Sequence, residues 1–297
     1  MDWRYKAAAF RVIDGLPGGT VLHYFLQRHV TRSVPRPLSG YSQYLEESRA
    51  IAEVLRDGID MSDHHYFEFG AGWDLFHNLV LYSYGMQRQF LMDLTAHMRP
   101  ELVNHVIRNL QASPPPGAHR VPERLLTASP VEELSTHYGI TYHAPSDASR
   151  VPLMGGAISL SSTVNTMEHI PFDALSAILR ELRRICAPSA RLAMQIDYSD
   201  HYSHADRSIS PYNFLQFSDS HWQRHNTRSH YQSRRRHPDY RELFLSSGFR
   251  IISERVRRPD DWHRALAGIA LHPEFQAYDQ ADVAITSAMF SLEPACH

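Results

Sequence analysis

The stretch that decides the fold of this chain is Tyr66-Phe67-Glu68-Phe69-Gly70-Ala71-Gly72-Trp73-Asp74. Its first four residues are typical of the end of a buried β-strand, and Gly70 and Gly72 bracket a turn where the backbone can approach a ligand closely. Apolar residues then follow at helical spacing, at Leu75, Phe76, Leu79 and Val80. A strand, a glycine-rich turn and a helix in this order predict the nucleotide-binding crevice of a doubly wound α/β sheet.

The acid directly before the turn, Glu68, indicates which kind of ligand fits there. A carboxylate is poorly suited to hold a pyrophosphate, because like charges repel. It suits a nucleoside that carries a positively charged amino-acid group, of which S-adenosylmethionine (SAM) is the common one. The motif alone also fits a tight turn with no ligand, since the full Gly-x-Gly-x-x-Gly pattern is absent.

Two later strands are predicted to end in acids at the same edge of the sheet. Residues 89–93 predict the second strand, and Asp93 follows the turn by about 20 residues, where such folds place the carboxylate that binds ribose hydroxyls. Residues 140–143 predict the third strand, which leads to Ser146, Asp147 and Ala148. We expect Asp147 to meet the adenine amino group.

These pieces together resemble class I SAM-dependent methyltransferases. The matching residues are 68–72, Asp93, 146–148 and the run 161–171, which is similar to the fourth strand of that family and the turn after it. The resemblance covers about residues 60 to 292. It implies a doubly wound α/β fold with a seven-stranded, mostly parallel sheet and helices on both faces.

The resemblance also implies SAM as the cofactor. The residues expected to bind it are Glu68, Gly70, Gly72, Trp73, Asp93, Leu94, Asp147, Ala148, Ser162 and Thr163. In that family the last two strands form an antiparallel hairpin at one edge of the sheet, and the final strand is inserted beside the fifth.

Apolar periodicity and helix breakers place the remaining elements. Residues 1–60 are predicted to be an N-terminal helical cap, which either closes over the ligand or packs on the sheet edge, and residues 61–297 are the predicted SAM-binding domain. Further helices are predicted near 100–112, 172–187 and 234–248, and further strands at 190–197, 250–256 and 283–292. The arginines at 234–236 are expected at a solvated helix start.

The composition limits the partners and the compartment. The 297 residues carry a formal net charge of −2 and are 43% hydrophobic, so we expect a large core and no general attraction to nucleic acid or acidic membranes. Cys186 and Cys296 are the only cysteines, which fits a reducing, cytoplasmic compartment. We expect no signal peptide and no membrane span. A small-molecule substrate is expected, and the oligomeric state stays open.

Catalytic residues are harder to predict, because displacement at a sulfonium needs alignment and exclusion of water more than acid–base groups. His169 and His201, after the fourth and fifth strands, are candidate general bases, since imidazole titrates near neutrality. Each is otherwise an ordinary loop or surface histidine. Tyr212 and Asn213 are predicted either to cover the reacting end of the ligand or to plug the core.

No metal site is predicted from the sequence. A weak metal-ligand pattern is formed by Asp197, Asp200, His201 and His204. A His-x-x-His spacing without helical context or a fixed fourth ligand is a weak signal for a metal.

Three functions fit these residues. We expect methyl transfer from SAM to a small molecule. The alternatives are cyclisation of SAM to azetidine-2-carboxylate with release of methylthioadenosine, and a non-catalytic SAM-binding protein. The sequence has no basic stripe with interleaved aromatic residues, which argues against nucleic acid as the acceptor.

Overall fold

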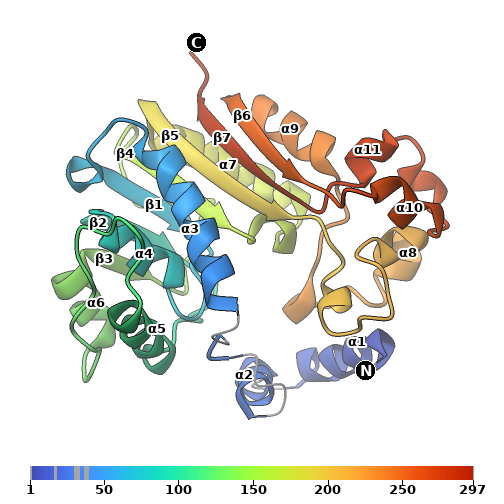
Figure 1. The fold of residues 1–297 in the computed structure, drawn as a ribbon, viewed down its shortest axis with the longest axis horizontal. Helices are drawn as coiled ribbons and strands as arrows, with labels where there is room; N and C mark the ends of the chain where they lie inside the picture. The colour runs from blue at the N-terminus through green and yellow to red at the C-terminus, as the bar shows by residue number, and fades with distance from the viewer. Residues whose placement is uncertain (1, 17–18, 30–33, 37–39, 297) are drawn as a thin grey trace.

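The fold is built on one seven-stranded sheet with helices on both faces (Figure 1). The computed structural model describes residues 2–16, 19–29, 34–36 and 40–296. The strands are β1 (His65–Phe69), β2 (Arg88–Met92), β3 (Ile140–His143), β4 (Ile158–Val164), β5 (Cys186–Asp197), β6 (Phe249–Arg257) and β7 (Ser287–Pro294). The helices of eight residues or more are α1 (Trp3–Asp14), α2 (Gly19–His29), α3 (Tyr41–Arg56), α4 (Phe76–Ser83), α5 (Pro100–Ala112), α6 (Pro130–Tyr138), α7 (Phe172–Ile185) and α9 (His237–Ser246). Shorter ones are α8 (Asp219–Trp222), α10 (Trp262–Ala267) and α11 (Gln280–Val283).

The strand order is β3-β2-β1-β4-β5-β7-β6. Strands β1 to β5 pair in parallel, and β7 runs antiparallel to both β5 and β6. The predicted α/β fold is therefore confirmed, including the final strand beside the fifth. The order reverses between β1 and β4, and in open α/β sheets ligands bind at the carboxyl ends of the strands at such a reversal.

The final strand begins later than its sequence pattern predicts. Residues 283–292 were expected to form it, whereas the structure ends α11 at Val283 and starts β7 at Ser287. The apolar residues Val283, Ala284 and Ile285 are all buried, so they carry a strand-like pattern without pairing in the sheet.

Each face of the sheet has its own apolar core. Tyr66 of β1 faces α3, α4, α5 and α6, and its neighbour Phe67 faces α7 and α9, because successive strand residues point to opposite faces. Helix α7 shows why these segments are helical. It buries Leu175, Ile178, Leu179, Leu182 and Ile185, which lie three or four residues apart on one side. Full burial of each contributes about 1.5–3 kcal/mol.

The helices of residues 1–60 pack in two different places. Helix α3 lies on the sheet, where it contacts α4, β4 and β5 and buries Ile51 and Leu55 in the core. Helix α1 instead contacts two short 3-10 helices, His201–His204 and Arg228–His230, in the segment after β5. The domain boundary between residues 60 and 61 stays a prediction, since α3 shares the core of the sheet.

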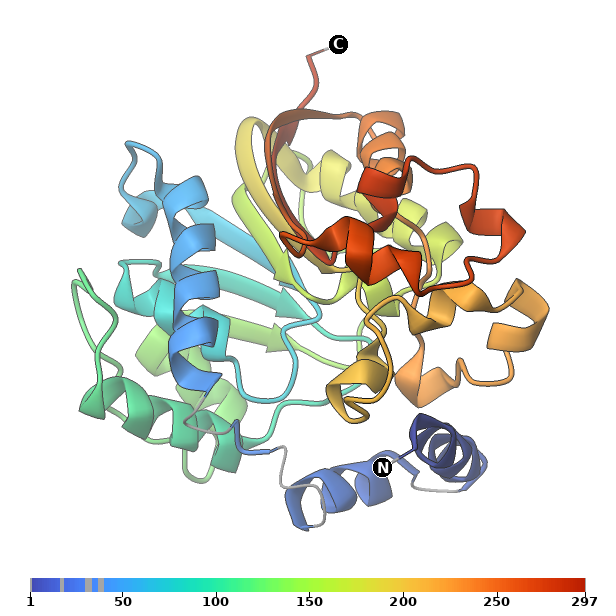
Figure 2. The same ribbon diagram turned by 45° about the vertical axis from the view of Figure 1, so that its right-hand side comes forward.

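Helix α1 is held by a third core outside the sheet. Its Trp3, Ala7 and Phe10 pack with Tyr202 and Trp222, and Trp3 N donates to Asp206 Oδ2 at 2.9 Å. Figure 2 shows α1, in dark blue, below the yellow-orange segment that follows β5. The two ends of this contact are 203 residues apart in the sequence.

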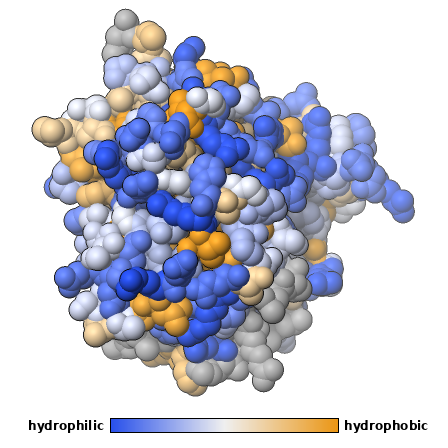
Figure 3. Space-filling view, turned by 60° about the vertical axis from the view of Figure 1, so that its left-hand side comes forward, coloured by the Kyte–Doolittle hydropathy of each residue, from blue (hydrophilic) through white to orange (hydrophobic). Residues whose placement is uncertain are grey.

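The helices and the surface were compared with what a membrane span requires. Within the described ranges, no helix combines the length and the apolar character needed to cross a bilayer. On the face shown in Figure 3, apolar residues form small, separate patches among hydrophilic ones.

Candidate functional site

The glycine-rich turn after β1 has the backbone geometry that its sequence predicts. Gly70 and Gly72 have φ values of +75° and +80°, which side-chain-bearing residues rarely adopt. A Cβ added at Gly70 would lie 2.2 Å from Cγ2 of Thr166, in the loop after β4. A Cβ added at Gly72 would have no heavy atom within 4 Å. The turn is thus packed on one side and open on the other, where a ligand has room.

Asp93 lies directly beside this turn. The side chain is buried, Tyr142 donates to its Oδ2 at 2.9 Å, and the backbone N–H groups of Ala71 and Gly72 lie near the carboxylate. Burial raises the pKa of Asp93 to about 6, and these three donors limit the rise. A carboxylate accepts about four hydrogen bonds, and Tyr142 supplies one of them, so Asp93 keeps acceptor capacity for a ribose hydroxyl.

Glu68 is the centre of a buried polar network beneath the turn. Tyr66 Oη and Asn78 Nδ2 both donate to Glu68 Oε2 at 2.6 Å. Ser162 Oγ lies 2.7 Å from the same tyrosine hydroxyl and 2.9 Å from His77 Nε2. Burial raises the pKa of Glu68 to about 7, and it lowers the pKa of His77 to about 3. The network fixes the floor of the crevice while holding a carboxyl group that ionises near neutrality.

Two N-terminal segments contact the residues that directly follow the turn, and the sequence did not reveal these contacts. The ring of Trp73 stacks on Tyr24 of α2 with centroids 5.2 Å apart, and on His97 with centroids 4.9 Å apart. Arg36 Nε lies 2.5 Å from Asp74 Oδ2. Trp73 was predicted to bind the cofactor, and in the structure its ring already stacks on Tyr24 and His97.

Arg36 and Tyr24 lack any sequence signal because they come from segments with no motif. Arg36 lies in a proline-rich stretch, and its guanidinium carbon also lies 4.5 Å from the centroid of the Tyr44 ring. Only the folded chain brings this cation beside the first turn of α4.

Some of the remaining residues predicted to bind the cofactor are buried, and others are exposed to solvent. Thr163 is buried and its hydroxyl donates to the carbonyl of Phe69, so it joins β4 to β1 beneath the turn. Leu94 directly follows Asp93 and is 76% exposed. Asp147 is exposed and accepts from Ser149 N at 2.8 Å, while Ala148 is buried. The structure therefore gathers the predicted residues of β1, β2 and β4 at one edge and leaves Leu94 and Asp147 at its rim.

Tyr212 and Asn213 do not cover the crevice. Tyr212 is fully buried in the third core, and its hydroxyl donates to the carbonyl of Ala284 at 2.8 Å. Asn213 is buried and donates from Nδ2 to Asp200 Oδ2 at 2.9 Å. The prediction that these side chains form the wall of the pocket is wrong, because both are used to fold the segment after β5.

We expect Tyr212→Phe to lower the free energy of unfolding by about 1–2 kcal/mol, because the buried carbonyl of Ala284 loses its donor. Urea unfolding checks this loss. Calorimetry with SAM should give the same affinity as the wild type. A tenfold weaker affinity without loss of stability would return Tyr212 to the binding site.

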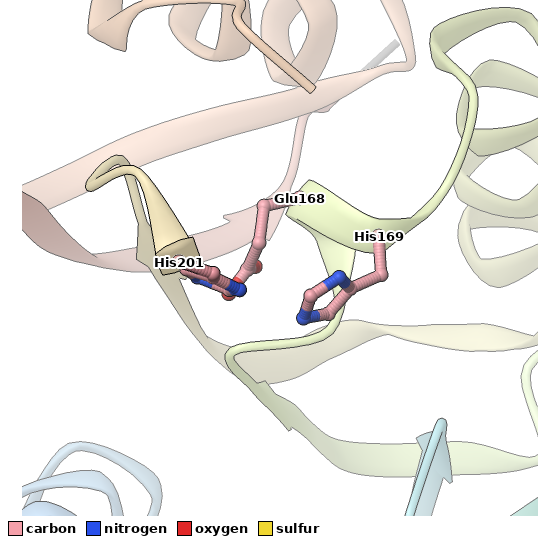
Figure 4. A group of neighbouring side chains, drawn as sticks. All are labelled: Glu168, His169 and His201. Atoms are coloured by element: carbon pink, nitrogen blue, oxygen red, sulfur yellow. The ribbon is translucent and has the colours of Figure 1, made fainter. Parts of the chain in front are cut away.

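The two candidate bases lie together with Glu168 at the edge of the sheet (Figure 4). The rings of His169 and His201 have centroids 4.9 Å apart, and His201 Nε2 lies 3.4 Å from Asp197 Oδ2. Partial loss of water around its ring lowers the pKa of His169, and the neighbouring His201 lowers it further. Burial raises the pKa of Glu168 well above its ordinary value. These groups come from the loops after β4 and β5, next to Thr166 and the turn.

A separate hollow of about 480 Å³ lies away from the turn. It is lined by Ser129, Pro130, Val131, Glu132, Ser135, Thr141 and Tyr142, from α6 and its approach and from β3. Tyr142 links it to the crevice through its hydrogen bond to Asp93. The chemistry-bearing groups gather elsewhere, so we place the site at the turn.

Comparison with known proteins supports the fold and goes no further. No protein-family model matches this sequence, and no curated protein resembles it in sequence. Among solved structures, the cyclase SpnF has a TM-score of 0.50 and 11% identity, covering 86% of this chain and 83% of its own. Geranyl diphosphate C-methyltransferase from Streptomyces coelicolor A3(2) has a TM-score of 0.49 and 11% identity, covering 89% and 85%. Magnesium protoporphyrin IX methyltransferase from Synechocystis PCC 6803 has a TM-score of 0.47 and 11% identity, covering 86% and 84%.

Proposed function

We propose that this chain, which has the fold of class I SAM-dependent methyltransferases, binds SAM and transfers its methyl group to a small-molecule acceptor. The observation that carries the proposal is the turn at Gly70 and Gly72, which is open at Gly72 and has Asp93 beside it. In doubly wound sheets a nucleoside lies at this position, with its ribose on the acid after the second strand. A SAM molecule there has its methionine half over the turn.

The charges of the crevice suit both ends of the methionine half. Glu68 lies under the turn, where its carboxylate would attract the ammonium group directly or through water. Arg36 is paired with Asp74, two residues after Gly72, but its side chain is still partly exposed and would attract the SAM carboxylate. The zwitterionic methionine half of SAM would have its ammonium near Glu68 and its carboxylate near Arg36. A pyrophosphate above Glu68 would instead be repelled by the carboxylate.

Asp93→Asn tests the ribose contact. The amide keeps the size of the side chain but removes its charge, so we expect SAM affinity to fall by about 1.5–3 kcal/mol, or roughly 10- to 150-fold. Isothermal calorimetry with SAM and with S-adenosylhomocysteine measures the loss, and both ligands should lose it equally because they share the ribose. An unchanged affinity in a folded variant, judged by circular dichroism, would contradict the assignment.

One incubation separates the three candidate functions. Purified protein with SAM alone is followed by mass spectrometry over time. Methylthioadenosine would indicate cyclisation of SAM, and binding without any product in the presence or absence of candidate acceptors would indicate a binding protein. S-adenosylhomocysteine formed only when an acceptor is added supports the methyltransferase. SAM that does not bind at all would overturn the proposal.

A further inference from the structure

Three metal-ligating side chains converge beside the proposed SAM site. Glu168 and His169 belong to the 3-10 helix Met167–His169 after β4, and His201 begins the one after β5, His201–His204. One oxygen of Glu168 and one ring nitrogen of each histidine all lie within 4.8 Å of one another. Figure 4 shows the three side chains directed toward a common point between the two loops.

The Glu168 carboxylate is a buried group without a partner. The side chain is 1% exposed, and neither oxygen forms a hydrogen bond. Its own N–H and that of Asp197 lie near it, but neither has the geometry of a bond. A buried carboxylate left this way is strongly unfavourable unless it is protonated or compensated by a cation.

We propose that Glu168, His169 and His201 bind one divalent first-row transition-metal cation. Two imidazole nitrogens and one carboxylate oxygen favour Zn²⁺, Co²⁺, Ni²⁺ or Fe²⁺ over Mg²⁺ and Ca²⁺, which prefer oxygen ligands alone. Three protein ligands leave at least one position open, as catalytic rather than structural sites do.

One short segment, residues 231–233, holds all three ligands in place. His169 Nδ1 lies 2.8 Å from the carbonyl of Tyr231, so Nδ1 carries the proton and Nε2 keeps its lone pair for a metal. Gln232 Oε1 accepts from His201 N at 3.0 Å, and Ser233 N donates to the Glu168 carbonyl at 2.7 Å. This is the supporting shell that metal-binding histidines need.

The ligand atoms must close slightly around an ion. In a tetrahedral site with bonds of about 2.0–2.1 Å, ligands lie roughly 3.4 Å apart. Bringing atoms at most 4.8 Å apart to that spacing needs movements of about an ångström, within reach of rotations of the partly exposed His169 and His201. Asp197, with Oδ2 at 3.4 Å from His201 Nε2, is positioned to orient that ring.

The position of this site suggests the class of acceptor, and this step rests on the proposed function. Thr166, two residues before Glu168, donates to the carbonyl of Gly70 at 3.2 Å, so the cation would lie next to the reacting end of SAM. A metal-bound hydroxyl loses its proton to water, and the oxygen then attacks the methyl carbon. The carbon–sulfur bond breaks, its electron pair stays on sulfur, and S-adenosylhomocysteine leaves. We therefore infer an acceptor with a metal-binding hydroxyl group.

Direct metal binding tests the site without any assay of turnover. Tag-free protein is stripped with chelator and titrated with Co²⁺, and the visible absorption of bound Co²⁺ and equilibrium dialysis give the affinity and stoichiometry. We expect one equivalent to bind, and Glu168→Gln, His169→Ala and His201→Ala each to weaken it by at least about tenfold. His263→Ala on α10, an exposed histidine, should match the wild type.

Each outcome decides between the inferences. Loss of Co²⁺ binding in the three variants, with unchanged circular dichroism and SAM affinity, supports the site. The inference fails if the wild type binds no Co²⁺, if the variants bind it like the wild type, or if Mg²⁺ binds more tightly than Co²⁺. If His169→Ala does not fold, the Co²⁺ affinity of Glu168→Gln tests the site, because this substitution keeps the size of the side chain. SAM binding without metal binding leaves the proposed function standing, and metal binding without SAM binding overturns that function alone.

Discussion

Gly72→Ala is expected to weaken SAM binding by roughly 10- to 100-fold while the fold survives. The new methyl group enters the open space above the turn, where the proposed ligand lies, and overpacking of this kind costs about 1–3 kcal/mol. The φ of +80° adds a strain of about 1–2 kcal/mol to the free energy of folding. Calorimetry with SAM and urea unfolding separate the two effects.

Two other glycines provide matched controls. Gly117 has a φ of +75° and no heavy atom within 4 Å of an added Cβ, so Gly117→Ala carries the strain without touching the crevice. It should lose about 1–2 kcal/mol of stability and no SAM affinity. At Gly70 the added Cβ meets Thr166 at 2.2 Å, so Gly70→Ala should lose about 3 kcal/mol of stability. If Gly72→Ala behaves like Gly117→Ala, the ligand does not lie over the turn.

The second large effect concerns pH and Glu68. The pKa of its carboxyl is raised from 4.5 to about 7 by burial, so the folded state holds its proton more tightly than the unfolded state. Stability from this group is therefore complete below about pH 4.5 and is lost as the pH rises to about 7. The loss amounts to about 3 kcal/mol, at 1.36 kcal/mol per pKa unit.

Glu68→Gln isolates this contribution, because the amide cannot ionise. We expect the free energy of unfolding of the wild type to fall by about 3 kcal/mol more than that of the variant between pH 4.5 and 8. Urea unfolding at each pH gives the difference. Parallel curves would mean that Glu68 does not titrate in this range.

Bound SAM should reverse part of this behaviour. If its ammonium lies near Glu68, SAM favours the ionised carboxylate, and its affinity for the wild type weakens as the pH falls below about 7. The Glu68→Gln variant should lose this dependence. Asp93, whose pKa is raised to about 6, contributes its own pH dependence to SAM affinity. It is present in both the wild type and Glu68→Gln, so its contribution cancels when the two affinities are compared.

Local sequence signals predicted most of the fold. The β1 strand, its turn and α4 are adjacent in the sequence, so glycine positions and apolar spacing identify them directly. Asp93 was predicted to lie near the turn from its distance along the sequence, and it does, because the crossover length in such folds varies little; its contact with ribose stays a prediction. Sequence-based prediction worked for elements whose structure is determined by residues within the same short segment.

Predictions failed where a side chain's role depends on a distant segment. Tyr212 and Asn213 look the same in sequence whether they line a pocket or a core, and only the position of Ala284 and Asp200 decides it. Arg236 was expected in solvent but is fully buried, with its guanidinium donating to the carbonyls of Tyr198, Val283 and Ile285. Apolar periodicity in the sequence cannot predict that a buried arginine donates hydrogen bonds to three backbone carbonyls.

The docking of α1 on the segment after β5 has a consequence for protein synthesis. Trp3 is made 203 residues before Asp206, its hydrogen-bond partner. At about 5–20 residues per second, the ribosome needs roughly 10–40 s to supply that partner. Until then the apolar stripe of Trp3, Ala7, Phe10 and Ile13 has nothing to cover it in the native way. During synthesis the apolar stripe of α1 therefore stays uncovered until the segment after β5 has been made, and exposed apolar surface of this kind promotes aggregation.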